Sequence, residues 1–301
     1  MNYEQIKDRL KVIDFPIAIN SIKDIPEDMG RVVVRTDHMP NTPLGIVGSR
    51  YKPIPHIDAF GGALKAIQSG GIDLTNAKIE INSYEEGALA KMELIMPSHR
   101  AKIGNHDLQL KFVARNSYNA RWKFQSFFGW LNEVCFNTLV SGEKLAYTAS
   151  RHTKFFNVEQ ANLKIKNAVN AVTNETVKFQ NWWDTRVEDA DVAEMFKATI
   201  AKSQATEAQL NGGSPDTNRK QLHILMGLYE SEAKQIHGKG DYGRNGAKGS
   251  LWCAYQSATA WSTHLTDIAD TTKKQHIVQQ RRQADVRNMI LSKSWKQLET
   301  A

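Results

Sequence analysis

The sequence has few cysteines and no long apolar run, and both features narrow its class. Its 301 residues include two cysteines, Cys135 and Cys253, which lie far apart in the chain. Such a pair excludes a disulfide framework and a zinc knuckle, so we expect a reducing, cytoplasmic setting. No segment approaches the roughly 18 apolar residues of a membrane span. The N-terminus mixes charges into every turn, so it does not resemble a secretory signal.

Residue patterns typical of catalysis are also scarce. The glycine-rich stretch 237–249 lacks the Gly-Lys-Ser/Thr of a phosphate loop, so it is interpreted as a basic loop that touches nucleic acid or as a plain connector. The carboxylates of Glu80, Glu85, Glu86 and Glu93 suggest a divalent-ion site for nuclease chemistry. Strand alternation divides them between two faces, which argues against that site. No catalytic residue, metal site or cofactor is predicted, and a role without catalysis is favoured.

Positive charge is concentrated in two parts of the chain. The net charge is +7, of which residues 100–123 contribute +5 and residues 239–301 another +5, which leaves −3 elsewhere. Localised positive charge is typical of proteins that bind nucleic acid. For the basic C-terminal helix, a solvated face is an equally good interpretation.

The first half of the chain alternates short strands with one clear helix. Residues 1–30 predict a short helix and an irregular lead-in, and Pro97 with residues 98–106 predicts a loop. A continuously apolar segment, 127–140, predicts a buried helix or the end of a strand. The remaining predicted elements are strands at 31–35 and 44–47, a helix from 57 to 67, and two strands within 77–96 around a turn at 83–87.

From residue 157 onward the pattern is almost wholly helical. Apolar residues at helical spacing predict helices over 157–185, 188–209, 217–236 and 250–298. The predicted fold class is therefore α+β, with antiparallel β-hairpins and flanking helices in the N-terminal half and a helical C-terminal half. We expect an α+β domain at 1–150 and a helical region at 151–301, either separate or packed as one unit.

The clearest alternation lies between residues 107 and 125. Leu108, Leu110, Phe112 and Ala114 share one parity before a polar turn at 116–119. A register that pairs Arg115 with Arg121 places Ala114 opposite Trp122 and Phe112 opposite Phe124 on a dry face. The opposite face then carries four basic residues, namely Lys111, Arg115, Arg121 and Lys123. Such a hairpin suggests binding to a polyanion.

Six short motifs follow one another along the chain, namely Val47–Ile54, Asp58–Phe60, Asn116–Asn119, Val134–Leu139, Arg151–Thr153 and Gly249–Trp252. Together they resemble an uncharacterised family carried by phages and plasmids, known as domain of unknown function 932. The resemblance spans roughly residues 44–298. The family's usual Asp-Gly at the hairpin tip is replaced by Asn119 and Ala120, and no catalytic residues come with the resemblance.

The predicted architecture is also similar to that of phage single-strand annealing proteins. Those proteins form rings or filaments and hold single-stranded DNA in a positively charged groove beside a β-hairpin. This likeness concerns architecture alone, and a fold does not specify a function.

We therefore expect a phage-type protein that binds single-stranded nucleic acid, DNA in preference to RNA, and acts in annealing or recombination as a homo-oligomer. The rival hypothesis is a phage accessory or virion-associated protein that acts through protein contacts, and a metal-dependent nuclease ranks third. In the first hypothesis the rings of Tyr51 and Tyr118 stack on unpaired bases. The predicted nucleic-acid-binding residues are Arg50, Tyr51, Arg100, Lys102, Lys111, Arg115, Tyr118, Arg121, Lys123 and Arg151.

Overall fold

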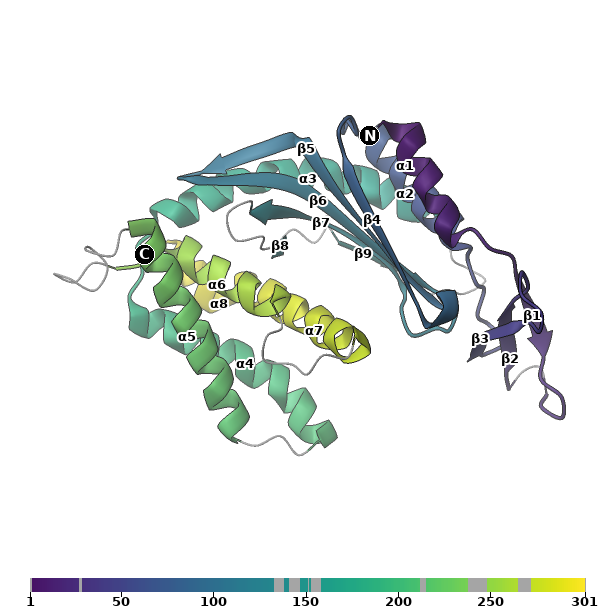
Figure 1. Ribbon diagram of the computed structural model, residues 1–301. Coiled ribbons are helices and arrows are strands. Elements are labelled where there is room, and N and C mark those ends of the chain that lie inside the picture. Colours follow the sequence, from purple (N-terminus) through teal and green to yellow (C-terminus); the bar gives the residue numbers. More distant parts are fainter. Residues whose placement is uncertain are drawn as a thin grey trace. The chain divides into compact units, whose positions relative to one another are not determined.

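The computed structural model confirms the α+β class (Figure 1). It describes residues 2–26, 29–132, 138–140, 147–150, 152, 158–211, 215–237, 248–264 and 272–300. The chain forms two compact units. The first comprises Met1–Arg100, Gln109–Gly129 and Glu143–Thr173, and the second comprises Ala101–Leu108, Trp130–Gly142 and Asn174–Ala301. The expected boundary near residue 150 stays a prediction.

The strands confirm most of the expected positions, and the sheet continues beyond them. The predicted strand at 31–35 is β2 (Arg31–Arg35), and the two strands within 77–96 are β4 (Lys78–Tyr84) and β5 (Leu89–Ile103) around the 3₁₀ turn η2 (Glu85–Gly87). The described parts of segment 127–140, residues 127–132 and 138–140, are strand, and residues 133–137 lie outside the described residues. The other strands are β1 (Ile17–Ser21), β3 (Thr42–Val47), β6 (His106–Ser117), β7 (Phe124–Asn132), β8 (Thr138–Val140) and β9 (Tyr147–Ser150).

A small antiparallel sheet in the order β1-β2-β3 packs beside the hairpin end of the first unit (Figure 1). Val33, Leu44 and Val47 from this sheet form one buried cluster with Phe15, Ala88 and Tyr118. The Arg35 guanidinium lies 4.0 Å above the centre of the Phe15 ring. These contacts join β2 and β3 to the end of the large sheet.

The large sheet has the order β4-β5-β6-β7-β8, and β9 pairs with β7. The predicted apolar side of β6 is buried, since Leu108, Leu110, Phe112 and Ala114 are at most 2% exposed. Helix α2 (His56–Ser69) contributes the buried Phe60, Leu64 and Ile67, which follow the helical spacing seen in the sequence. Helix α1 (Tyr3–Arg9) begins with a capping box between Asn2 and Gln5.

The predicted register of the central hairpin was wrong. Strand β6 continues to Ser117 and β7 begins at Phe124, so Trp122 lies in the loop, where its ring meets that of Tyr84. The Phe112 ring contacts the Phe128 ring at 4.9 Å between centroids, four residues beyond Phe124, the predicted partner. Asn116 and Ser117 favour turns because their side chains compete for backbone partners. Here both side chains find such partners within the folded unit, which lets the strand continue past them.

The predicted loop at Pro97 was also wrong, because β5 runs through it. Strand β4 begins at Lys78, opposite Ile95, so the edge of β5 next to Pro97 has no β4 partner. Proline lacks an N–H donor and is tolerated at such an edge. The turn into β6 is made at Gly104, whose φ is +56°. A Cβ there would lie 2.2 Å from the Trp183 ring, which leaves room for glycine alone.

The helices of the second half match the predicted pattern within a few residues, except that 250–298 is divided. They are α3 (Val158–Asp184), α4 (Asp189–Asn211), α5 (Pro215–His237), α6 (Leu251–Thr263), α7 (Thr272–Ile290) and α8 (Lys293–Glu299). Helix α6 begins at the N-cap Ser250 and is buried along its whole length. No described helix is long and apolar enough to cross a membrane.

Aromatic rings form the core of the helical unit. The Trp182 ring lies 4.9 Å from Tyr255 and 5.0 Å from Trp295, between centroids. Both tryptophans donate a hydrogen bond to the carboxylate of Glu299, at 2.7 and 3.3 Å. The buried N–H groups of these two tryptophans are thus satisfied by one side chain of α8.

The basic C-terminal helix is only partly a solvated face. Arg282 is 4% exposed, lies 4.6 Å from the Trp261 ring centre, and donates to the backbone oxygen of Trp261 and to Gln221. Arg282 is therefore a core residue, although the sequence pattern placed it among the basic residues of the C-terminal helix. Lys293 and Lys296 are exposed, and Lys296 pairs with Glu299.

Replacing Ala120 with glycine is expected to stabilise the first unit by about 0.5–1 kcal/mol. Ala120 has a φ of +60°, a left-handed conformation that costs roughly 1 kcal/mol for residues with a Cβ. Chemical denaturation measures the effect. The matched control is Ala284→Gly in α7, which should lose about 1 kcal/mol because glycine is unfavourable inside a helix. Equal losses in both variants would contradict the strained turn.

Candidate nucleic-acid interface

The loop between β6 and β7, Tyr118–Lys123, is fixed by hydrogen bonds at its base. The Ser117 hydroxyl donates to the backbone oxygen of Trp122 at 2.8 Å and accepts from its N–H at 3.2 Å. Within the loop, the Asn119 side-chain oxygen accepts from the N–H of Arg121 at 3.2 Å. Asn119 also packs so closely on Gly45 that a Cβ there would lie 2.4 Å from its own. These contacts fix the conformation of the hairpin loop.

A second loop, Gly48–Lys52, is tied to the hairpin loop. The Tyr51 hydroxyl donates to the backbone oxygen of Ser117 at 2.7 Å. Arg31 donates to the backbone oxygens of Ser49 and Tyr51 at 2.7 and 3.1 Å. We refer to the segments Gly48–Lys52 and Tyr118–Lys123 together as the loop pair.

The loop pair carries four exposed basic residues, Arg50, Lys52, Arg121 and Lys123. Arg50 and Lys52 flank the half-buried Tyr51, and Lys123 follows the anchored Trp122. Arg121 forms an ion pair with Glu85 in the turn η2. These residues come from two segments about 70 positions apart in sequence, and the folded unit brings them to one end of the sheet.

Tyr118 is a core residue, and the expectation that it stacks on bases was wrong. It is fully buried, and its hydroxyl accepts a hydrogen bond from the N–H of His56 at 2.9 Å. Its ring centre lies 4.1 Å from that of His56. Burial raises the pKa of its hydroxyl well above the usual value. Tyr51 keeps part of its ring exposed, and burial also raises the pKa of its hydroxyl.

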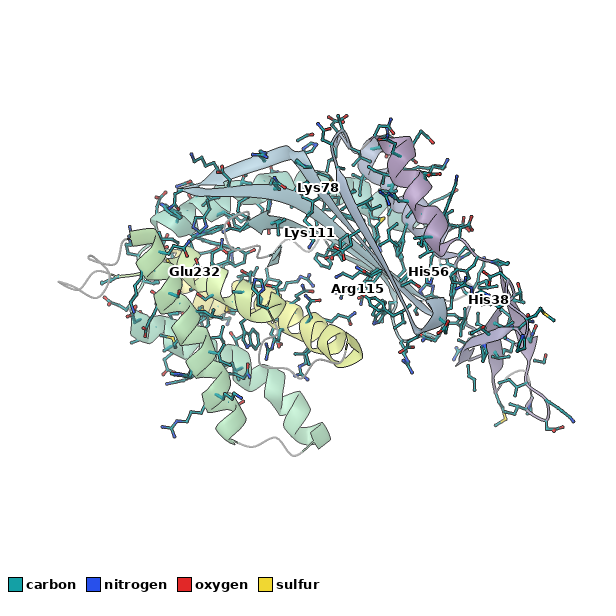
Figure 2. The ribbon with its side chains drawn as sticks, viewed as in Figure 1. His38, His56, Lys78, Lys111, Arg115 and Glu232 are labelled. Carbon is teal, nitrogen blue, oxygen red and sulfur yellow. The ribbon has the colours of Figure 1, made fainter. Side chains whose placement is uncertain are left out.

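Lys111 and Arg115 do not form the predicted open basic face. Arg115 is 3% exposed, and the Lys111 side chain is 13% exposed. Both project from β6 (Figure 2). Glu93 accepts from Lys111 at 2.9 Å and from Lys91 at 3.0 Å. We refer to Lys91, Glu93, Lys111 and Arg115 as the sheet-face charge cluster.

Burial and the nearby opposite charges shift the pKa values of Lys91 and Glu93 in opposite directions. Burial lowers the pKa of Lys91, and the nearby positive charges of Arg115 and Lys111 lower it further, although Glu93 acts in the other direction. Burial alone would raise the pKa of Glu93, but Lys111 and Lys91 outweigh it, so that the pKa is lowered. The Glu93 carboxylate is therefore ionised at neutral pH. Because Glu93 contacts both lysines and Arg115 is buried, this face is a poor surface for binding a polymer.

The remaining predicted residues are not part of the loop pair. Arg100 is exposed on β5 and donates to the backbone oxygen of Pro97 at 3.1 Å. Lys102 is exposed and belongs to the second unit. Arg151, Cys135 and most of the glycine-rich stretch 237–249 lie outside the described residues. Thus the structure brings Arg50, Tyr51, Arg121 and Lys123 together in the loop pair, with Tyr118 buried at its base.

Sequence reasoning missed Lys52 and Lys91, and it considered Glu93 only as a metal ligand. Lys52 follows Tyr51 directly, so the alternation of charge and aromatic at 50–52 was a usable signal. Lys91 and Glu93 share a parity within an otherwise apolar strand, which indicates a polar patch on one sheet face.

Two of the carboxylates considered for a metal site form ion pairs with basic side chains. Glu93 contacts two lysines, and Glu85 contacts Arg121. In the part of the chain that the structure describes, no three His, Cys, Asp or Glu side chains lie close enough to share a metal ion. The histidine at the centre of the first unit, His56, is fully buried, and burial lowers its pKa to about 4.

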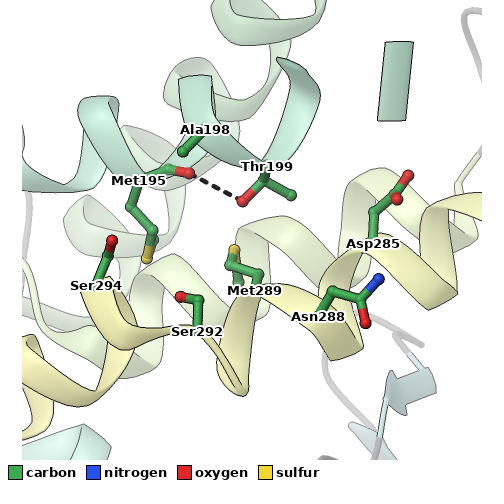
Figure 3. Close-up of a pocket in the computed structure, with 8 residues that line it drawn as sticks. All are labelled: Met195, Ala198, Thr199, Asp285, Asn288, Met289, Ser292 and Ser294. Carbon is green, nitrogen blue, oxygen red and sulfur yellow. Dashed lines mark hydrogen bonds between the residues drawn. The ribbon is translucent and has the colours of Figure 1, made fainter. Parts of the chain in front are cut away.

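A small cavity lies in the helical unit between α4, α7 and α8 (Figure 3). Its volume of about 40 Å³ accommodates little more than ordered water. Thr199 in its lining donates to the backbone oxygen of Met195 at 2.9 Å. The cavity is too small for a nucleotide or a metabolite.

Three of the motifs of the family resemblance meet in the first unit, whereas Gly249–Trp252 belongs to the second. Tyr51 bonds to Ser117, the Asn116 amide donates to the backbone oxygen of Ile54 at 3.0 Å, and Tyr118 contacts His56 two residues before Asp58. The Tyr51 ring also lies 5.3 Å from that of His152. Motifs up to 100 residues apart thus build one cluster directly beneath the loop pair.

Comparison with known proteins gave one match. No curated protein and no solved structure matched the chain. A family model described as a domain of unknown function, DUF932, matches residues 43–288, which include the loop pair, the sheet-face charge cluster, helices α2 to α6 and most of α7. The chain therefore belongs to the DUF932 family.

Proposed function

We propose that the protein binds single-stranded nucleic acid through the loop pair. The observation that carries this proposal is the gathering of four exposed basic residues on two segments that hydrogen bonds hold together. Flexible cationic side chains contact phosphates without selecting a base sequence. The exposed part of the Tyr51 ring lies between Arg50 and Lys52, where an unpaired base can stack. Stacking of this kind favours a single strand over a duplex.

Binding is expected to fall steeply with salt. If about four phosphates are neutralised on a single strand, the slope of log K against log salt should be near −3. Fluorescence anisotropy with a labelled oligodeoxynucleotide, and with the matching RNA, measures both the slope and the preference. Affinity that does not change between low and physiological salt would contradict phosphate contacts.

Reversing the charge at Arg50, Lys52 and Lys123 to glutamate should weaken binding by about 100-fold or more. The estimate assigns roughly 1 kcal/mol to each of three lost phosphate contacts. Exposed substitutions usually change stability by less than about 0.5 kcal/mol each, so the fold should be retained. The matched control reverses Lys164, Lys166 and Lys220, three exposed lysines on helices α3 and α5. If both variants bind equally, the loop pair is not the interface.

Annealing is the activity that the architectural likeness implies, and we include it in the proposal. It calls for a homo-oligomer, a ring or a filament, that presents strands to one another. Electron microscopy with and without single-stranded DNA, together with strand annealing followed by fluorescence quenching, tests it. Binding without assembly would restrict the function to single-strand binding. Strand annealing by an assembled oligomer would support a phage-type recombination role.

A second candidate function is favoured by the small sheet. Ile46 is 69% exposed, and Met29 and Met39 nearby in the chain are 74% and 92% exposed. Exposed apolar side chains favour a protein contact, as expected for an accessory or virion-associated protein. Indifference to nucleic acid in all the experiments above would support this candidate. Magnesium-dependent cleavage would instead indicate a nuclease.

A further inference from the structure

Glu85 begins an unusual turn. The three residues of η2, Glu85, Glu86 and Gly87, have φ values of +53°, +56° and +96°. Side chains disfavour this left-handed region, and two successive glutamates in it are rare. Such backbones persist only where surrounding contacts hold them, and they concentrate at functional sites.

Hydrogen bonds from three other elements hold the turn. Arg35 of β2 donates to the backbone oxygen of Glu86 at 3.3 Å, and the ring of His56 donates to that of Gly87 at 2.9 Å. The N–H of Tyr118 donates to the backbone oxygen of Ala88 at 2.7 Å. The backbone of Glu85 is therefore positioned relative to the hairpin loop.

The Glu85 carboxylate faces the hairpin loop with both oxygens. One oxygen pairs with the Arg121 guanidinium, and the other accepts from the Asn119 amide at 3.1 Å. The Arg121 and Glu85 side chains are 46% and 34% exposed, so both are reachable from solvent. A carboxylate and a phosphate use the same geometry on a guanidinium. Glu85 thus occupies the position on Arg121 that a phosphate oxygen would take.

We propose that Glu85 sets the affinity of the interface by competing with nucleic-acid phosphate for Arg121. This inference rests on the proposed function. A strand already held by Arg50, Lys52 and Lys123 places a phosphate near Arg121 at high effective concentration and displaces the carboxylate. A free mononucleotide lacks those contacts and leaves the ion pair intact. Glu85 therefore favours polymers over single nucleotides.

Glu85→Gln tests the competition. The amide keeps the size of the side chain and can still accept from Asn119, but it holds Arg121 weakly. We expect two- to five-fold tighter binding of a single-stranded oligonucleotide, the size of effect that an exposed ion pair permits. The salt slope should stay near −3, because the strand contacts the same four phosphates whether or not it has to displace Glu85. Affinity for a mononucleotide should rise at least as much, which narrows the preference for polymers.

Glu86→Gln is the matched control. It makes the same change of charge one residue away, in the same left-handed turn, at a side chain for which the structure shows no contact with Arg121. Equal shifts in the two variants would overturn the competition and leave the proposed function intact. So would a loss of thermal stability in Glu85→Gln with unchanged or weaker binding, which indicates a purely structural role.

A double-mutant cycle with Arg121→Gln isolates the pair. In that background Glu85→Gln should no longer tighten binding. A gain that persists without Arg121 would overturn the inference. If neither the wild type nor Glu85→Gln binds nucleic acid, the proposed function fails and the inference fails with it.

Discussion

Between about pH 6.5 and pH 4, the free energy of unfolding is expected to fall by about 3 kcal/mol for each of His56 and His152. Burial lowers the pKa of both histidines from 6.5 to about 4 in the folded chain. Below pH 6.5 both histidines become protonated in the unfolded chain, whereas in the folded chain they stay neutral down to about pH 4. Acidification therefore favours the unfolded chain. Stability is complete above pH 6.5, declines through this window and levels off below it. One unit of pKa corresponds to 1.36 kcal/mol, which gives the magnitude.

The geometry around His56 explains why it stays neutral. Its Nδ1 accepts from the Asn116 amide at 2.8 Å, and its Nε2 donates to the backbone oxygen of Gly87 at 2.9 Å. A proton on Nδ1 would face the N–H of Asn116. That amide cannot turn without losing its bond to the backbone oxygen of Ile54.

Urea titrations at pH values from 4 to 8 measure the effect. His152→Phe keeps a ring beside Tyr51 and should remove about half of the slope between pH 6.5 and 4. The exposed His264→Phe is the control and should leave the pH profile unchanged. A wild-type stability that is flat across this window would contradict the buried neutral histidines.

The second large effect is expected at Glu93. Glu93→Gln removes the carboxylate that Lys91 and Lys111 both contact on a face where Arg115 is also buried. Breaking one partner out of a buried ion cluster costs about 3–5 kcal/mol, because uncompensated charge remains inside. The Glu93 side chain is 17% exposed, so solvent screens it little. We expect a loss of at least about 3 kcal/mol in chemical denaturation.

Glu80→Gln is the matched control for Glu93. Glu80 lies directly opposite Glu93 in the β4–β5 register and is exposed. It should change stability by less than about 0.5 kcal/mol. If the two variants behave alike, water screens the cluster, and the charges on this face contribute little to the fold.

The periodic elements could be predicted from the sequence because their pattern repeats over several turns or residues. The strand at 31–35, helix α2 and helices α3 to α5 were found close to their true limits. The errors occurred where tertiary contacts outweigh local preference. Asn116 and Ser117 extend β6 because Ile54 and Trp122 satisfy their side chains. Pro97 lies within β5 because its neighbouring strand has already ended.

The sequence indicates several of the basic residues of the candidate site, but not which of them are exposed or lie close together. Alternation places Lys111 and Arg115 on one face correctly, but it carries no information about what covers that face. The burial of Tyr118 depends on His56, which is 62 positions away. Likewise, the loop pair exists because Tyr51 bonds to Ser117, a contact that no local pattern records.

The division of the chain into two interleaved units restricts how the protein can be cut. The first unit ends at Thr173 and omits 101–108 and 130–142, which belong to the second. A fragment that stops at residue 150 therefore lacks the last 23 residues of one unit and carries two orphan segments of the other. Expression of either half alone is expected to give insoluble or partly folded material. Fragment screening and crystallisation should therefore begin from the whole chain.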